Sequence, residues 1–595
     1  MTLAEPVAAA TEIDVIPAVR PTADGLAGNA ASPEALKQLS KALRASPKAR
    51  LGAGHLKAAL EAVKAGDFHT GTQRALAALK MDERNGLAWH ILAICREKAG
   101  DLAQALSAYD AALKLSPDES GIAHDLGRLA QRLGYLDIAE KLFLRMLTLR
   151  PGHIEATNNL ACVQRDQNRY EDAIETLRAL IQIHPESPIL WNTLGTVLSD
   201  QGDVKAAMPF FDEALRLKPD FAKARYNRGN ARQPMGDTLG ALEDVEAARP
   251  GAESPYEAAM MEMARSNLLL NLGRVQEGFE AYEARLDPAM PDAMHVMSAD
   301  PRWTPGMDLK GRRLLVIGEQ GIADEMIFAN VIPDLTEAVG TEGRLYLAVE
   351  PRLAELFRRS FPEAVVGGHR TVRHEGRMIR LMPFMQGHDP VDAWGPMASF
   401  LRQFRPSIDS FPDHGGYLRA DPDRVARWAR ELEALGPGLK VGLHWKSLVL
   451  KGSRARYFSA FERWAPLLRT AGCRFVNLQC GDTAQDLAEA EAAGLQIWTP
   501  PFDLRNDLDD LAAMSCALDL VIGPGIAGTN IAAAVGARTW LIAAPDDWHR
   551  LGSDRYPFYP RVRLFETGRY DGWPEVIARM SDTLAGVARD GWNGD

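Results

Sequence analysis

The feature that most constrains this chain is a 34-residue period in its first half. Prolines recur at this interval, and alanines recur at the same interval in a second register: Pro117, Pro151, Pro185 and Pro219, and Ala105, Ala139, Ala173, Ala207 and Ala241. Such a period is typical of stacked helix pairs, in which each unit buries its apolar face against the next unit. Small residues let the paired helices approach closely, and each proline ends the second helix of a unit. The first half is therefore predicted to be an α-helical superhelix.

Large and small side chains also recur around these anchors, as in Trp89 and Tyr109 and again in Trp191 and Phe211. The pattern resembles the tetratricopeptide repeat (TPR). Five clear units run from about residue 86 to 255, and degenerate units on both sides extend the predicted TPR solenoid to about seven repeats over residues 52–287. A solenoid of this length is expected to offer a concave groove.

The rest of the chain has a different organisation. Residues 1–51 are rich in Ala and Pro and are predicted to form a disordered N-terminal tail, and residues 288–310 form a proline-rich linker. Short, nearly continuous apolar runs then alternate with helical stretches: 312–318, 344–349, 440–445, 474–479, 519–523 and 539–544. This alternation predicts an α/β fold with parallel sheets, in two Rossmann-like domains (311–420 and 421–595) that face each other across a cleft. Ligands are expected beyond the carboxyl ends of the strands.

Composition excludes several classes of protein. The 595 residues carry 68 Lys and Arg against 79 Asp and Glu, a net charge of −11, so no nucleic-acid partner is expected. No apolar run approaches the ~20 residues of a membrane span, and the start of the chain does not resemble a signal peptide, so we expect a cytoplasmic protein without membrane insertion. The five cysteines form no CxxC motif, and neither a metal site nor a disulfide framework is expected.

Three carboxylates follow the first predicted strand of the α/β region. Glu319 comes directly after it, and Asp324 and Glu325 open the next helix. Acids in a first turn complement the helix dipole, which is one reading. The competing reading is a general base that deprotonates an acceptor hydroxyl, with Asp324 as the leading residue.

A glycine-rich turn follows the predicted strand 519–523. Gly525 and Gly528 allow close backbone approach, and Thr529 and Asn530 open the next helix, whose free N–H groups form an anion site. A plain strand-to-helix turn is the alternative. The turn matches neither the dinucleotide-binding nor the P-loop pattern, which disfavours NAD binding and ATP hydrolysis.

A dense cationic segment follows the predicted strand 440–445 in an otherwise acidic protein. Its residues are Lys446, Ser447, Lys451, Arg454 and Arg456. These side chains are either a solvated loop or a set that neutralises a nucleotide phosphate. Gln479 ends another strand and is either a surface amide or a contact to a base or ribose.

One polar position recurs in the first helix of successive repeats. It is occupied by His90, His124, Asn158 and Asn192, again 34 residues apart. Such a row can hydrogen-bond an extended peptide backbone, which makes these residues candidates for acceptor binding. A solvated inner face is the alternative.

Several segments together carry a family resemblance over residues 52–585. They are GRRLLVIGEQGIADE, LHWKS, FVNLQCG, DLVIGPGIAGTNIAAAVGARTWLI and DDWHRLGSDRYPFYP. The chain resembles bacterial proteins that fuse TPR repeats to a GT-B glycosyltransferase module, in particular the alphaproteobacterial flagellin glycosyltransferases of the FlmG type. The resemblance implies that the repeats bind flagellin. It also implies that the module transfers a nonulosonic acid, pseudaminic or legionaminic, from its CMP-activated form to Ser or Thr before export.

The resemblance also implies roles for particular residues. Asp324 matches the acid after a GxGD-like turn in heptosyltransferase relatives, although Ala323 stands where they have glycine. Lys446, Arg454, Arg456 and Gln479 match positions that face the nucleotide, whereas Gly523, Pro524 and Asn530 depart from the relatives' pattern. GT-B enzymes generally need neither a metal nor another cofactor.

Two functions from different classes follow. The first is an inverting, metal-independent O-glycosyltransferase that acts on a protein held by the repeats, here flagellin or another secreted protein. The second is a non-catalytic TPR scaffold or chaperone adaptor for flagellin or an envelope protein, with a degenerate GT-B module. Heptose transfer to lipopolysaccharide is disfavoured, because a peptide-binding solenoid serves no purpose there.

Overall fold

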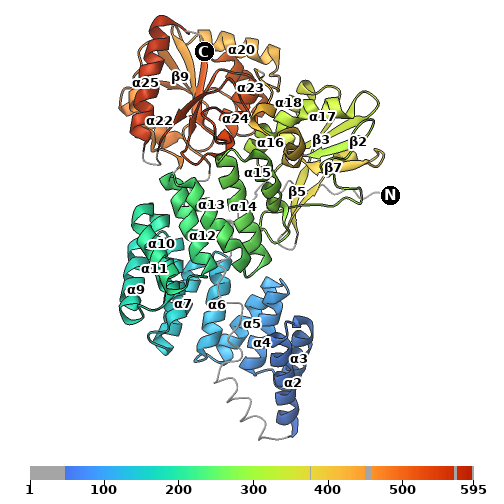
Figure 1. Cartoon of the computed structure of the whole chain (residues 1–595), viewed down its shortest axis with the longest axis vertical. Helices are drawn as coiled ribbons and strands as arrows, with labels where there is room; N and C mark the ends of the chain where they lie inside the picture. Colours follow the sequence, from blue (N-terminus) through green and yellow to red (C-terminus); the bar gives the residue numbers. More distant parts are fainter. Residues whose placement is uncertain (1–46, 375–376, 414, 449–456, 569–571, 593–595) are drawn as a thin grey trace, which may run out of the picture. The chain divides into compact units, whose positions relative to one another are not determined.

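The computed structural model describes residues 47–374, 377–413, 415–448, 457–568 and 572–592. The chain forms two compact units, one ending at Gln201 and the other beginning at Gly202 (Figure 1). Stacked helix pairs come first along the chain and an α/β region with parallel sheets follows, which confirms the predicted fold class. The predicted tail lies outside the described residues up to position 46. Helix α2 begins at Pro47, inside the segment assigned to that tail.

The described part of the first unit consists of short helices that pack in consecutive pairs, such as α4 with α5 and α6 with α7. Aspartate or asparagine side chains cap several of them: Asn85, for example, accepts the N–H of Ala88. A Cβ on Gly127 would lie 2.8 Å from the Phe143 ring, so glycine lets these paired helices approach. The helices are α2 (Pro47–Lys64), α3 (Phe68–Met81), α4 (Gly86–Lys98), α5 (Leu102–Leu115), α6 (Ser120–Arg132), α7 (Leu136–Leu149), α8 (Ile154–Asp166), α9 (Tyr170–Ile183) and α10 (Pro188–Gln201).

The second unit begins with further helices of the repeat region. Helix α12 packs against α13, and α14 packs against α15. Ser254 caps α14, and Pro255 occupies its first turn, where the missing N–H costs nothing. The elements are α11 (Val204–Leu217), α12 (Ala222–Arg232), η2 (Gln233–Met235), α13 (Thr238–Ala248), η3 (Arg249–Gly251), α14 (Pro255–Asn271), α15 (Val275–Tyr282) and η4 (Glu283–Leu286).

The first α/β domain contains a parallel sheet with the strand order β4-β3-β2-β7. Its strands are β2 (Arg313–Ile317), β3 (Arg344–Val349), β4 (Val365–Gly368) and β7 (Ala393–Pro396). A separate three-stranded sheet pairs β1 (Met294–Val296) in parallel with β6 (Arg377–Leu381), which is antiparallel to β5 (Arg370–His374). The helices are α16 (Ile322–Phe328), η5 (Ala329–Val331), α17 (Ile332–Val339), η6 (Pro351–Leu353), α18 (Ala354–Ser360), η7 (Pro383–Met385), η8 (Met397–Phe400), α19 (Leu401–Phe404) and η9 (Ile408–Ser410).

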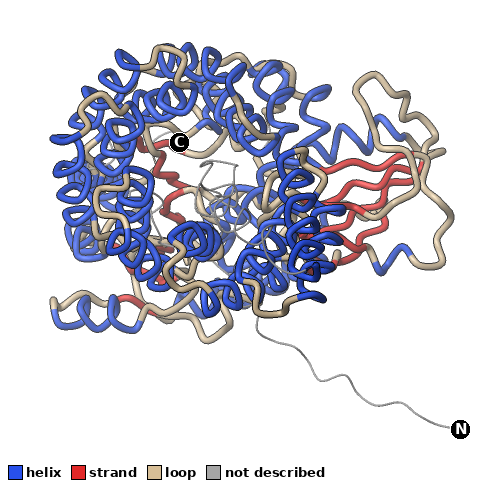
Figure 2. The backbone as a smooth tube through the Cα atoms, turned by 90° about the horizontal axis from the view of Figure 1, so that it is seen from below, coloured by secondary structure: helices blue, strands red, loops and turns tan. Residues whose placement is uncertain are grey.

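The second α/β domain is built on a six-stranded parallel sheet, β10-β9-β8-β11-β12-β13, and Figure 2 distinguishes its strands from the helices. The strands are β8 (Leu439–Leu443), β9 (Cys473–Asn477), β10 (Ile497–Trp498), β11 (Leu520–Pro524), β12 (Thr539–Ala543) and β13 (Arg563–Glu566). The helices are α20 (Pro422–Glu433), η11 (Phe461–Trp464), α21 (Ala465–Leu468), α22 (Ala484–Ala492), α23 (Leu508–Ala517), α24 (Ala527–Ala534), η12 (Trp548–Arg550) and α25 (Trp573–Asp590).

One apolar core runs through much of the second unit. It begins with Leu270 and Phe279 of the last repeat, includes Phe328 of the first α/β domain and continues to Met514 and Phe558 of the second. The last repeat and the two α/β domains therefore share a single packed interior. A second cluster fills the other side of the six-stranded sheet, around Trp464 and Trp540.

The six predicted strands correspond to β2, β3, β8, β9, β11 and β12. The predicted linker 288–310 is more structured than its composition indicated, because it contains β1 and the fully buried Trp303. The unit boundary after Gln201 also falls inside the predicted solenoid.

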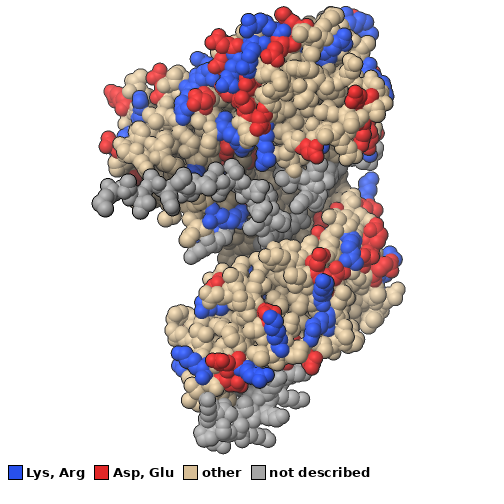
Figure 3. Space-filling model, turned by 180° about the vertical axis from the view of Figure 1, so that it is seen from behind, with Lys and Arg blue, Asp and Glu red and all other residues tan. Residues whose placement is uncertain are grey.

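The surface and the helices bear on the kind of partner. In the face that Figure 3 shows, Lys and Arg lie next to Asp and Glu on both units. None of the described helices is long and apolar enough to cross a bilayer. All five cysteines are unpaired, and no group of three His, Cys, Asp or Glu within the described ranges could hold a metal ion.

Candidate active site

The loop after β2 carries the three predicted acids. Arg380 of β6 holds this loop in place, because its guanidinium donates to the carbonyls of Gly318 and Glu319. A Cβ on Gly318 would lie 2.3 Å from the Glu325 carboxylate, so glycine is required for this acid to pack under the loop. Helix α16 then starts at Ile322, with Asp324 and Glu325 in its first turn.

Both carboxylate oxygens of Glu325 are engaged in structural contacts. Its Oε2 accepts the N–H of Glu350 at 2.9 Å, and its Oε1 lies 3.0 Å from Nε2 of the buried His369. Arg380 is 3.9 Å away. The Glu325 carboxylate thus joins α16 to the segments that follow β3 and β4.

Both carboxylate oxygens of Glu319 are engaged in structural contacts as well. Arg285 of η4 donates to both of its carboxylate oxygens, at 2.9 and 3.1 Å, and the N–H of Ala398 donates to Oε1 at 2.7 Å. Both side chains of this bidentate pair are buried. The pair joins the end of the repeat region to the first α/β domain.

Asp324 differs from both, because its carboxylate has no hydrogen-bond donor among the described residues. Burial, together with the negative charge of Glu319, raises the pKa of Asp324 to about 6, although the neighbouring His549 opposes the shift. A carboxyl group with this pKa is ionised at pH 7 and still basic enough to take a proton. Among the three predicted acids, Asp324 is the one whose carboxylate is not held by a hydrogen bond within the described residues, and it stays the leading candidate for the base.

Helix α16 packs against α24 (Figure 1), and Tyr556, on which the charge of Asp324 acts, has its hydroxyl 4.0 Å from the place where a Cβ on Gly525 would lie. Strand β11 ends at Pro524, Gly525 is exposed, and α24 begins at Ala527. The two helices whose starts the sequence singled out, one from each α/β domain, therefore pack against each other in the second unit.

His444, at the carboxyl end of β8, is a site residue that sequence reasoning missed. A Cβ on Gly528 would lie 2.2 Å from its ring, and a Cβ on Gly523 would lie 2.7 Å from its Cβ, so both glycines make room for it. Burial lowers the pKa of His444 to about 3, which keeps the ring neutral. The LHWKS segment, which contains His444, was the sequence signal that could have identified this residue.

Buried polar atoms without partners surround the start of α24. Nε2 of His444, Oγ1 of Thr529 and Oδ1 of Asn530 find no hydrogen-bond partner in the described part of the chain. Such atoms are rare in folded proteins unless water or a ligand satisfies them. This cluster makes the start of α24 a candidate ligand site.

The predicted cationic segment is only partly described. Lys446 forms an ion pair with Asp486 at 2.5 Å, and Ser447, the next residue, is half-buried. Gln479 is buried, and its Oε1 accepts the N–H groups of Trp445 and Lys446, so its amide shapes the loop after β8. Lys451, Arg454 and Arg456 lie outside the described residues.

The polar row of the repeats is buried in the first unit. His90 is hydrogen-bonded to Asp125 of the next repeat at 2.8 Å, and Nε2 of His124 lies 3.1 Å from the amide of Asn159. Asn158 and Asn192 are buried too. The two histidines link neighbouring repeats, and a peptide would reach them only by displacing those contacts. Acceptor binding by this row stays a prediction.

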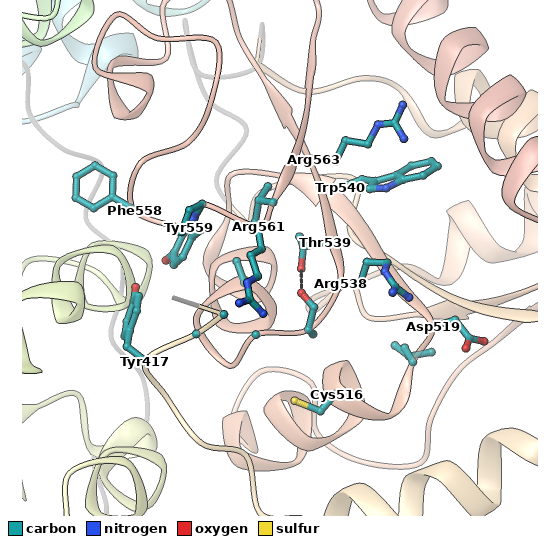
Figure 4. Close-up of a pocket in the computed structure, with 18 residues that line it drawn as sticks. Tyr417, Cys516, Asp519, Arg538, Thr539, Trp540, Phe558, Tyr559, Arg561 and Arg563 are labelled. Carbon is teal, nitrogen blue, oxygen red and sulfur yellow. Dashed lines mark hydrogen bonds between the residues drawn. The ribbon is translucent and has the colours of Figure 1, made fainter. Parts of the chain in front are cut away.

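A cavity of about 1070 Å³ lies at the opposite edge of the second domain's sheet, at the amino ends of β11, β12 and β13. Figure 4 shows Arg538, Arg561 and Arg563 spread along it rather than directed at one point. Arg538 lies over the Trp592 ring and Arg563 over Trp540. Since parallel sheets bind ligands at their carboxyl ends, this cavity is distinct from the candidate site.

Comparisons with known proteins agree with the repeat region and extend beyond it. Residues 56–120 match the tetratricopeptide repeat family, and residues 89–218 match the family described as the middle TPR-like domain of cilia and flagella-associated protein 70. Protein FlbA of Caulobacter vibrioides is 48% identical over 563 residues, which cover 94% of each chain. Human tetratricopeptide repeat protein 7B is 30% identical over 119 residues, 20% of this chain and 14% of that protein. A solved tetratricopeptide repeat protein from Parabacteroides merdae aligns at 17% identity with a TM-score of 0.36, covering 40% of this chain and 94% of its own.

Proposed function

Because this chain belongs to the FlbA family, with a relative that matches it along almost its whole length, we propose that it is a protein O-glycosyltransferase of the GT-B type. Its substrate is flagellin or another secreted protein that the TPR region captures. Its donor is a nucleotide-activated sugar, a CMP-linked nonulosonic acid such as pseudaminic or legionaminic acid, and the reaction takes place in the cytoplasm. The resemblance to the flagellin glycosyltransferases supplies the acceptor and the sugar class.

One observation carries the proposal. Asp324, an acid with a pKa of about 6 and no hydrogen-bond donor in the described part of the chain, stands on a helix that packs against α24, and buried polar atoms near the start of α24 lack partners. A transferase needs a base for the acceptor hydroxyl and an anion site for the departing nucleotide. The two packed helix starts offer both.

The reaction follows from these roles. Asp324 takes the proton of a Ser or Thr hydroxyl while that oxygen forms a bond to the anomeric carbon. The bond between the anomeric carbon and the phosphate oxygen breaks, and the nucleotide leaves with the electron pair as an additional negative charge. The backbone N–H groups at the start of α24 and the side chain of Thr529 stabilise this charge. Attack opposite to the leaving group inverts the anomeric centre.

The decisive test uses the full-length protein, flagellin and the CMP-activated sugar, with the intact mass of flagellin as the readout. Asp324→Asn is expected to slow transfer by at least ~10²-fold, because it removes the base. Glu337→Gln is the matched control: it removes one negative charge from the exposed side of α17 and is expected to leave the rate unchanged.

Two outcomes would contradict the proposal. An Asp324→Asn protein with the rate of the unaltered chain would remove this acid from the mechanism. Flagellin that binds the unaltered protein but gains no mass would favour the non-catalytic adaptor.

A further inference from the structure

A histidine after β12 is held in a fixed orientation beside the candidate site. Asp547 lies 2.6 Å from Nδ1 of His549 and also accepts its backbone N–H. The imidazole stacks on Trp548 at 3.8 Å between ring centroids and on Tyr556 at 5.8 Å. With Nδ1 occupied by a carboxylate, the remaining polar atom of the ring is Nε2.

That atom is available to a ligand. The His549 side chain is 20% exposed, and its Nε2 makes no hydrogen bond to any residue that the structure describes. Other histidines of this unit are placed differently: His444 is buried and neutral, and His369 is occupied by Glu325. His549 is thus both oriented and open.

Its position links the two helix starts. Tyr556, which stacks on His549, has its hydroxyl 4.0 Å from the place where a Cβ on Gly525 would lie. Asp324 is close enough for its charge to act on both His549 and Tyr556. The imidazole therefore flanks the region between the proposed base and the glycine-rich turn.

We propose that His549, held by Asp547, binds the phosphate of the nucleotide-sugar donor through its Nε2–H. This rests on the proposed function for the identity of the ligand as a nucleotide. With Nδ1–H donating to Asp547, the doubly protonated ring directs its other N–H, at Nε2, toward the ligand. The imidazolium then donates a charge-assisted hydrogen bond to an anionic oxygen, and this bond strengthens as the leaving phosphate gains charge.

The charge balance around the ring explains why a cation is needed there. Asp324 faces the same region, so without a positive group an anionic donor would meet a carboxylate. Arg550, the next residue, is paired with Glu566 at 2.8 Å. The titratable or charged groups that face or adjoin His549 are Asp547, Asp324, Tyr556, Tyr282, Asp546 and Arg550.

The test measures binding of CMP, with UMP as a second probe, to the full-length protein by calorimetry at pH 6, 7 and 8. His549→Gln is expected to weaken CMP binding about tenfold or more at pH 6, the loss typical of one hydrogen bond to a charged group. His549→Arg keeps a positive donor and is expected to retain more of the CMP binding than His549→Gln.

Asp547→Asn tests the holding residue separately. It is expected to weaken CMP binding, because the imidazole loses the carboxylate that holds its orientation. His69→Gln, on the exposed side of α3, is the matched control. Melting temperatures of all variants show whether each is folded.

The inference is overturned if His549→Gln or Asp547→Asn binds CMP as the unaltered chain does at every pH. It is also overturned if the unaltered chain binds neither nucleotide. These binding results are independent of sugar transfer, so a protein that binds CMP through His549 but adds no mass to flagellin contradicts the proposed function and leaves the inference standing.

Discussion

At the scale of single residues, Asp324 is a group whose ionisation the fold opposes. Its pKa in the folded protein is about 6, above the ordinary value of 3.8, because burial disfavours the charged form. Below pH 3.8 the acid is protonated in both the folded and unfolded states and has no effect on stability. Between pH 3.8 and 6 only the unfolded state ionises, so stability falls, and above pH 6 the full cost is present.

Asp324→Asn is therefore expected to stabilise the protein near neutral pH while it slows the proposed sugar transfer. A shift of this size corresponds to about 1–3 kcal/mol for a partly exposed group. The gain should be complete above pH 6 and vanish below about pH 4. Urea unfolding of both proteins at pH 7.5 and pH 4 measures it. Equal stabilities at pH 7.5 would show that the carboxylate carries no such cost.

The neighbouring acids show which properties of single residues can be predicted from sequence and which cannot. The sequence placed Glu319, Asp324 and Glu325 together at a helix start. It could not show which of them is free, because Arg285 lies 34 residues before Glu319 and His369 lies 44 residues after Glu325. Only the folded chain brings these partners to their acids.

At the scale of elements, α24 depends on two glycines that leave room for a histidine. The His444 ring occupies the space where a Cβ on Gly528 would stand, and His444 and Thr529 both approach Gly523. The start of α24 and the end of β8 thus form one packed unit. A change in either element should therefore disturb the proposed anion site.

Gly528→Ala is expected to displace the His444 ring, to destabilise the protein by about 1–3 kcal/mol as overpacking does, and to weaken CMP binding. Gly586→Ala is the matched control, because nothing lies within 4 Å of its added Cβ in α25. That change should be neutral or stabilise the helix slightly. Thermal melts and calorimetry compare the two. Unchanged CMP affinity in a stable Gly528→Ala protein would separate His444 from the site.

Element prediction succeeded where strands are buried on both faces. Strands β2, β3, β11 and β12 are continuous apolar runs and were recognised. Strand β5 was missed because its sequence, RTVRH, is largely exposed, and β10 was missed because it has only two residues. Pairing with a neighbouring strand, rather than their own composition, creates such elements.

At the scale of the whole molecule, the last repeat belongs with the α/β domains. The second compact unit begins at Gly202, and Leu270 and Phe279 share a core with both α/β domains. The buried Arg285–Glu319 pair crosses the predicted domain boundary. Repeat periodicity marks helix pairs but carries no information on which of them will pack against a later domain.

A fragment of residues 202–595 is therefore expected to unfold in one cooperative transition, whereas residues 311–595 should be strongly destabilised. The shorter fragment leaves Glu319 without Arg285, a loss of about 3–5 kcal/mol for a broken buried pair, and also uncovers the shared core. Circular dichroism melts of both fragments provide the comparison. Equal melting temperatures would show that the last repeat does not stabilise the α/β domains.

The contact between α14 and the loop after β12 limits where the repeat region can be changed without disturbing the candidate site. A Cβ on Gly552 would lie 2.7 Å from the backbone nitrogen of Gly273, and Asn271 donates to the carbonyl of Asp546, three residues before His549. The early repeats lie in the other compact unit, so lengthening or exchanging them is expected to leave this contact in place. An insertion at Gly273 would instead displace the loop that carries Asp546 and His549. Changes to the repeats should therefore leave this contact intact.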